Sequence, residues 1–209
     1  GELIGNIAHQ WRQPLSAITT AASGMRMQKE LDILSNDELY KSCDDIVTSS
    51  TYLSDTINEF RHLIKGDNLK KDYKVNTTIK QGISLVKNLL DSNLVKIINN
   101  FDKELVFHGF SNDLTQIIIN ILKNSNDAFS HTNQISERFI FIATTIKDKN
   151  LIITIKDNAG GVPSDILEKI FEPYFTTRHK TQGTGIGLYM SKNIIERNMN
   201  GYINAKNKF

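Results

Sequence analysis

The feature that most constrains the fold is a regular apolar repeat in the first third of the chain. From Leu39 to Ile64, mostly apolar side chains recur at alternating steps of four and three residues. A second repeat of the same rhythm runs from Ile4 to Met25. Two long helices joined near residues 29–36 make an antiparallel hairpin. Because two helices bury such a stripe poorly, the pattern predicts a homodimeric four-helix bundle.

The rest of the chain mixes helical and strand patterns, and a polar stretch separates it from the repeats. We predict an N-terminal domain at 1–66, a linker at 67–72 and a second domain at 73–209. The second domain is predicted to contain helices over 76–91, 111–130 and 184–199, a short helix after Pro163, and strands over 94–101, 105–108, 138–146, 151–156 and 202–207. The expected fold class is therefore α+β: the helical hairpin, then an α/β sandwich with helices on one face of a mixed sheet.

Composition and charge exclude several classes of protein. The 25 Lys and Arg against 23 Asp and Glu give a net charge of +2, which offers no basis for a nucleic-acid or membrane-surface partner. No apolar stretch approaches the roughly 20 residues that a membrane span needs. The lone Cys43 excludes an internal disulfide and fits a reducing compartment. We therefore expect a cytoplasmic fragment of a larger protein that makes no membrane contact itself.

The first motif with chemical potential surrounds His9, at a position of the repeat that faces water. An exposed imidazole is partly neutral at pH 7, and its neutral nitrogen is a nucleophile. Pro14 leaves the carbonyl of Gln10 without a helical partner. Taken alone, this pattern is more typical of a surface histidine beside a helix kink.

The second motif places Asn120, Asn124 and Asp127 on one face of a helix, at steps of four and three residues. Amide oxygens are hard, neutral ligands, which suits a Mg²⁺ ion already balanced by phosphates. By itself the pattern is more typical of the solvated face of an amphipathic helix.

The third motif runs from Asp157 through Gly161 to Val162, directly after a predicted strand. A carboxylate at a strand end can accept a hydrogen bond from an adenine amino group, and glycines let a base lie close to the backbone. The alternative is an ordinary turn leading into a helix that starts at Pro163.

The last motif, residues 183–188, is glycine-rich and opens a helix, where free N–H groups favour phosphate oxygens. It follows no strand and lacks Gly-Lys-Ser/Thr, so it predicts neither a Rossmann site nor a P-loop. Before it, residues 171–180 combine aromatic anchors with Arg178 and Lys180, which could meet phosphate from a mobile lid.

In this order and at these separations, the motifs resemble the catalytic part of a two-component sensor histidine kinase. Residues 9–15 resemble the H-box, 120–127 the N-box, 157–161 the G1 box, 171–175 the F-box and 183–188 the G2 box. The resemblance implies a dimerisation and phosphotransfer domain followed by a Bergerat-type ATP-binding domain. It also implies ATP and Mg²⁺ as cofactors, autophosphorylation of His9, and transfer to an aspartate on the receiver domain of a response regulator.

The resemblance also assigns roles to individual residues. Asn124 is implied as the main Mg²⁺ ligand with Asn120 near the metal, and Asp157 as the acceptor from adenine. The implied nucleotide contacts are Asn120, Asn124, Asp127, Asp157, Gly161, Val162, Thr177, Arg178, Gly183, Thr184, Gly185, Ile186, Gly187 and Leu188.

The chain departs from the family pattern in several places. Gln10 stands where many members have an acidic residue that takes the imidazole proton, and an amide cannot act as that base. Gln13 stands at a position implicated in dephosphorylating the regulator, where its amide could orient water for a phosphatase activity. Ala159 replaces a frequent glycine, and the stretch between Phe175 and Gly183 is short for a lid.

Three other functions stay open at this point. A regulatory scaffold would bind nucleotide without phosphorylating His9, and Gln10 motivates that reading. An ATPase of the gyrase or MutL type would share the nucleotide fold but would have no use for the histidine-bearing hairpin. DNA binding is a distant third, because no basic helix or stripe supports it.

Overall fold

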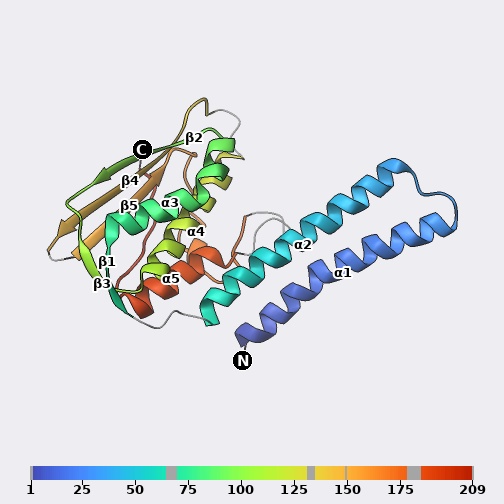
Figure 1. Ribbon diagram of the computed structural model, residues 1–209, viewed down its shortest axis with the longest axis horizontal. Helices are drawn as coiled ribbons and strands as arrows, with labels where there is room; N and C mark the ends of the chain where they lie inside the picture. Colours follow the sequence, from blue (N-terminus) through green and yellow to red (C-terminus); the bar gives the residue numbers. More distant parts are fainter. Residues whose placement is uncertain (1, 65–69, 131–134, 149, 178–184, 209) are drawn as a thin grey trace. The chain divides into compact units, whose positions relative to one another are not determined.

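The structure is a computed structural model that describes residues 2–64, 70–130, 135–148, 150–177 and 185–208 (Figure 1). The chain divides into two compact units. One holds the two N-terminal helices, and the other holds every strand of the described residues. Each unit has its own packing and is considered by itself.

The first unit is the predicted helical hairpin. It consists of α1 (Glu2–Glu30) and α2 (Asn36–Ile64), and α1 continues through Pro14. A capping box begins α2: Ser35 Oγ accepts from the N–H of Glu38 at 3.2 Å, and the Glu38 carboxylate accepts from the N–H of Ser35 at 3.3 Å. None of the described helices is long and apolar enough to cross a membrane.

Within one chain, the helix partner covers only part of the apolar repeat of α2. Every second member is half-buried, namely Leu39, Ile46 and Leu53. The alternate members are exposed, namely Cys43, Ser50 and Ile57. Among the side chains of this unit that the structure describes, Pro14 alone is buried. The hairpin therefore leaves half of its seam open to solvent.

The second unit alternates strands and helices along the chain. Its elements are β1 (Lys71–Lys74), α3 (Val75–Ser92), β2 (Val95–Phe101), β3 (Val106–Gly109), α4 (Ser111–Phe129), β4 (Arg138–Lys147), β5 (Asn150–Asp157), a 3₁₀ turn (Lys169–Phe171) and α5 (Gly187–Asn198). β4 pairs in parallel with β2 and antiparallel with β5, which confirms the predicted mixed sheet. β1 and β3 form a separate antiparallel pair.

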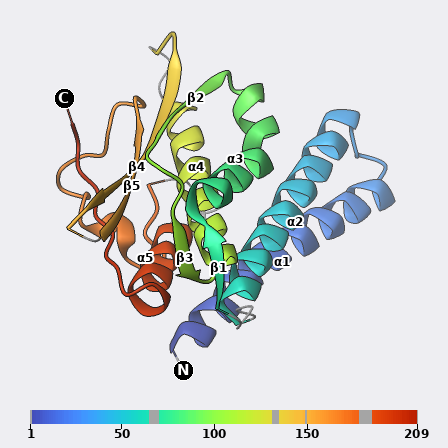
Figure 2. The same cartoon turned by 60° about the vertical axis from the view of Figure 1, so that its left-hand side comes forward.

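Helices cover one face of the three-stranded sheet, as Figure 2 shows for α3 and α4. Along β4, the buried Ile140 and Ile142 alternate with Phe141, which is 40% exposed on the other face. Ile79, Leu122 and other side chains of α3 and α4 pack against the buried row with no exposed surface. Each such side chain contributes roughly 1.5–3 kcal/mol by leaving water.

Three parts of the sequence-based prediction were wrong in the second unit. β1 was missed, because its antiparallel partner β3 lies more than thirty residues away in the sequence. The stretch after Pro163 forms turns and a short 3₁₀ segment in place of a helix. Residues 202–207 show the alternating burial of a strand but join no hydrogen-bonded ladder. Alternation thus identified an extended segment there, but it could not supply the partner that makes a strand.

Candidate functional site

Asn120 ties the middle of α4 to the start of α5. Its side chain is only 6% exposed. Its Oδ1 accepts from Nε2 of Gln116 at 2.9 Å, and its Nδ2 donates to the carbonyl of Gly187 at 3.2 Å and to Oγ of Ser191 at 3.4 Å. The amide expected near a metal therefore joins two helices, and its oxygen already accepts one hydrogen bond.

One turn further along α4, Asn124 presents an exposed side chain. Asp127 completes the predicted face and is half-buried. Of the two amides predicted to serve Mg²⁺, Asn124 is thus the accessible one. No group of three or more His, Cys, Asp or Glu gathers anywhere in the described parts of the chain. A divalent cation at this helix would therefore depend on amide oxygens and on the oxygens of its own ligand.

Asp157 ends β5, and both of its carboxylate oxygens are held in place. Oδ2 accepts from Oγ of Ser125 at 2.8 Å, and Oδ1 accepts from the N–H of Ala159 at 3.1 Å. Ser125 lies on α4 beside Asn124 and is only 5% exposed. Sequence reasoning missed Ser125, although a small hydroxyl residue directly after a candidate ligand on the same helix was a usable signal. The N-box helix thus orients the carboxylate of the G1 box.

The loop after Asp157 is anchored to the neighbouring strand by a second amide. Oδ1 of Asn158 accepts from the N–H of Phe139 at 2.8 Å, and its Nδ2 donates to the carbonyl of Glu137 at 2.9 Å. After Ala159, Gly160 and Gly161 have φ values of 97° and 81°. Only glycine adopts this region without a steric cost, so the loop leaves the strand end in a conformation that its glycines permit.

The F-box meets the start of the G2 helix through the backbone. Gly185 has φ of 64°, and a Cβ there would lie 2.5 Å from the carbonyl carbon of Tyr174. Tyr174 itself has φ of 65°, which costs a non-glycine residue about 1–2 kcal/mol. Burial, and after it the neighbouring Tyr189, raises the pKa of the Tyr174 phenol. The contact brings the backbone of Tyr174 and that of Gly185 together.

The remaining predicted contacts fall into two groups. Gly187 and Leu188 begin α5 and are half-buried, Ile186 before them is buried, and Thr177 is exposed. Arg178, Gly183 and Thr184 lie outside the described residues.

The predicted phosphotransfer residues all lie on α1. His9 and Gln10 belong to that helix, but their side chains are outside the described part. Gln13 is exposed. The structure thus gathers Asn124, Asp157 and the start of α5 around one helix, and leaves the phosphoacceptor role of His9 a prediction.

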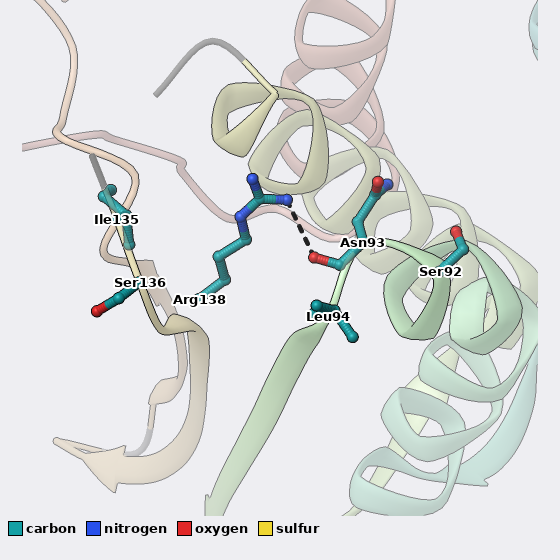
Figure 3. A pocket seen from close by; sticks show the side chains of 6 residues that line it. All are labelled: Ser92, Asn93, Leu94, Ile135, Ser136 and Arg138. Carbon is teal, nitrogen blue, oxygen red and sulfur yellow. Dashed lines mark hydrogen bonds between the residues drawn. The ribbon is translucent and has the colours of Figure 1, made fainter. Parts of the chain in front are cut away.

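A pocket of about 260 Å³ lies between the end of α3 and the start of β4 (Figure 3). It is lined by Ser92, Asn93, Leu94, Ile135, Ser136 and Arg138, none of them a predicted site residue. Nη1 of Arg138 donates to the carbonyl of Asn93 at 3.0 Å, and Nδ2 of Asn93 donates to Oδ1 of Asn126 at 3.0 Å. These polar groups fasten α3 to α4 and β4, so their role is structural.

Two family models match the chain in consecutive segments. Residues 1–69 match the His Kinase A (phospho-acceptor) domain. Residues 109–209 match the histidine kinase-, DNA gyrase B- and HSP90-like ATPase family, so the second unit carries an ATP-binding domain. Both matches coincide with the regions that contain the predicted motifs.

Curated relatives extend along nearly the whole chain. Sporulation kinase A of Bacillus subtilis is 29% identical over 202 residues, which cover 94% of this chain and 30% of that protein. Sporulation kinase B of the same species is 26% identical, with 100% and 46% covered. Sensor histidine kinase ZraS of Escherichia coli O157:H7 is 28% identical, with 94% and 41% covered. The chain thus spans less than half the length of these relatives.

Solved structures show the same fold. Histidine kinase ThkA, in complex with the response regulator protein TrrA, matches with a TM-score of 0.74 at 20% identity, covering 100% of this chain and 58% of that one. Histidine kinase AdeS of Acinetobacter baumannii matches with a TM-score of 0.63 at 16% identity, covering 90% and 86%. With both domain families present in order, and with related kinases matching along nearly all of this chain, the chain belongs to the two-component sensor histidine kinases.

Proposed function

We propose that the chain is the catalytic core of an ATP-dependent protein-histidine kinase that phosphorylates His9 and passes the phosphoryl group to an aspartate of a response regulator. The observation that carries the proposal is the order of the two domain families: a phosphoacceptor domain containing His9, then an ATPase-type domain containing Asn124 and Asp157. A phosphatase activity on the same regulator, with Gln13 orienting water, belongs to the proposal.

In the nucleotide site, Asp157 is the acceptor for the adenine amino group. Ser125 and the backbone of Ala159 support this role because they fix both carboxylate oxygens before any ligand arrives. The N–H groups around Gly185 and Gly187 lie at the start of α5, where backbone donors favour the binding of phosphate oxygens. Preorganised groups of this kind favour binding because little ordering is left to do.

The available residues fit Mg²⁺ at Asn124. Its carboxamide is exposed on α4, whereas the oxygen of Asn120 already accepts from Gln116. We therefore assign direct coordination to Asn124 and assign Asn120 mainly to holding the start of α5. When bound, Mg²⁺ neutralises charge on the phosphates.

In the transfer itself, an imidazole nitrogen of His9 forms a bond to the γ-phosphorus while the bond to the bridging oxygen breaks and ADP leaves. The ring proton passes to water, because the neighbouring Gln10 can orient the ring by a hydrogen bond but cannot act as a base. In the second step, the N–P bond breaks as a carboxylate oxygen of the regulator takes the phosphoryl group.

The proposed partners are a second copy of this chain and a receiver domain. The open half of the α2 repeat supports the homodimer, since a second hairpin would cover it. A regulator partner is supported by the related fold of ThkA, which was solved in complex with a response regulator protein.

The test is incubation with γ-labelled ATP and Mg²⁺, followed by measurement of protein-bound label that survives alkali and is lost in acid. We expect label on the wild type and on His108→Ala, a matched control at an exposed histidine of the second unit, and none on His9→Ala. Asn124→Ala should lose both label and Mg²⁺-dependent ATP binding.

Other outcomes would identify the alternatives. Bound nucleotide without label on the wild type would favour a regulatory scaffold. Steady ATP hydrolysis that persists in His9→Ala would favour an ATPase. Unchanged Mg²⁺-ATP affinity in Asn124→Ala would show that the metal lies elsewhere.

A further inference from the structure

One side chain from the end of the chain satisfies both backbone groups of a G1-loop residue. The N–H of Val162 donates to Oδ1 of Asn207 at 2.9 Å, and Nδ2 of Asn207 donates to the carbonyl of Val162 at 2.7 Å. Val162 lies in neither a helix nor a strand, so no ladder supplies these bonds. A carboxamide carries one acceptor and donors in the arrangement of a peptide group, so it can replace a neighbouring strand.

The preceding glycine is fitted to the same amide. A Cβ at Gly161 would lie 2.7 Å from Oδ1 of Asn207 and 3.2 Å from its Cγ. Because Gly161 also has φ of 81°, any larger residue would be strained and would displace the amide. Gly161, which we expected to let a base lie close to the backbone, is therefore also needed to leave room for the side chain of Asn207.

We propose that Asn207 is a positioning residue for the nucleotide site, acting through Gly161 and Val162; the proposal rests on the proposed function. The G1 loop is held at its start by Asn158, which pairs with Phe139 and Glu137 in the same two-bond manner. Asn207 holds its far end. The G1 loop, which borders the adenine in the proposed site, is thus held at both ends by hydrogen bonds from carboxamide side chains.

This placement makes the effect of Asn207 local to the base. Asp157 keeps its own bonds to Ser125 and Ala159 when Asn207 is removed, and the phosphate-binding start of α5 is held by Asn120. Loss of Asn207 therefore releases the loop end beside the base and leaves the phosphate end in place. A defect of the whole domain would weaken both ends together.

The experiment uses the full chain and compares the wild type with Asn207→Ala, and with Asn204→Ala as the control from the exposed side of the same segment. Affinities for ADP and for inorganic tripolyphosphate are measured by calorimetry with Mg²⁺. We expect Asn207→Ala to weaken ADP binding roughly tenfold, the worth of one to two hydrogen bonds, and to leave tripolyphosphate binding unchanged. Asn204→Ala should match the wild type with both ligands.

Hydrogen exchange at the Val162 amide reports directly on its hydrogen bond to Asn207. This exchange should accelerate in Asn207→Ala and stay slow in Asn204→Ala. Should the alanine variant fail to fold, Asn207→Asp keeps the size and the acceptor but loses the donor to the Val162 carbonyl. Asn207→Asp should also weaken ADP binding, but by a smaller factor than Asn207→Ala.

Unchanged ADP affinity with faster exchange would overturn the positioning role, as would an equal loss of ADP and tripolyphosphate binding. A wild type that binds no ADP would overturn the proposed function and this inference with it. That outcome is distinguishable, because it appears before any variant is compared.

Discussion

The two units of this chain reach stability in different ways. In the second unit, Ile79, Leu122 and Phe129 have no exposed surface, so it contains its own core. In the hairpin, Met27 and Val47 are 60% and 63% exposed, and the described part of α2 holds no buried side chain. The second unit can therefore fold on one chain, whereas the hairpin needs a second surface to cover its apolar stripe.

The two units also differ in how they position their candidate functional residues. Asp157 is oriented by contacts from α4 and from its own loop, so the proposed nucleotide site depends on tertiary structure. His9 belongs to α1, so its backbone position is set by that helix. A site that is oriented by tertiary contacts is sensitive to packing anywhere in its domain. A residue that is positioned by one helix depends only on that helix remaining folded.

The sharpest test of this contrast is Phe129→Ala. Removing a fully buried ring at the end of α4 should destabilise the second unit by about 3–5 kcal/mol. Leu34→Ala, at a half-buried position near the hairpin join, should cost much less. Denaturant unfolding followed by circular dichroism measures both, and equal losses would contradict the idea that the two units differ in core.

The next largest effect concerns the apolar repeat of α2. Leu53→Asp places an unpaired charge in the apolar repeat and should raise the dimer dissociation constant at least about a hundredfold. Thr48→Asp adds the same charge on an exposed position of α2 and should leave the dimer intact. Sedimentation over a dilution series gives the masses. A monomeric wild type, or a Leu53→Asp dimer of unchanged mass, would refute the seam.

The smallest effect is at the helix start. Ser35→Ala removes the hydroxyl that accepts from Glu38 and should cost about 1 kcal/mol of hairpin stability. ADP affinity should not change, since the nucleotide site lies in the other unit. A parallel fall in ADP affinity would show that the units are coupled more closely than their separate cores suggest.

Patterns local in sequence were predicted well. The hairpin, α3, α4, β4 and β5 all follow from periodicity within short windows. What was missed depends on segments that meet only in space. β1 forms only by pairing with the distant β3, and the role of Ser125 depends on its hydrogen bond to Asp157 at the end of β5. Residues 202–207 are held by the Asn207 side chain, where we expected backbone pairing with a strand.

The candidate site divides along the same line. Asp157 and Asn124 could be singled out because carboxylates and amides at a strand end or on a helix face suggest chemistry directly. Ser125, Asn158 and Asn207 could not, because their importance lies in which backbone or carboxylate they reach. The roles of His9 and Arg178 stay predictions.

The backbone contact between Tyr174 and Gly185 has a consequence for how the lid can vary in length. Its two ends are already together, so the entropy of closing the loop is the main cost of lengthening it. That cost grows only logarithmically, by about 0.6 kcal/mol for each doubling of length. The positions of the tyrosine and the glycine that close the loop therefore constrain it more than the number of residues between them.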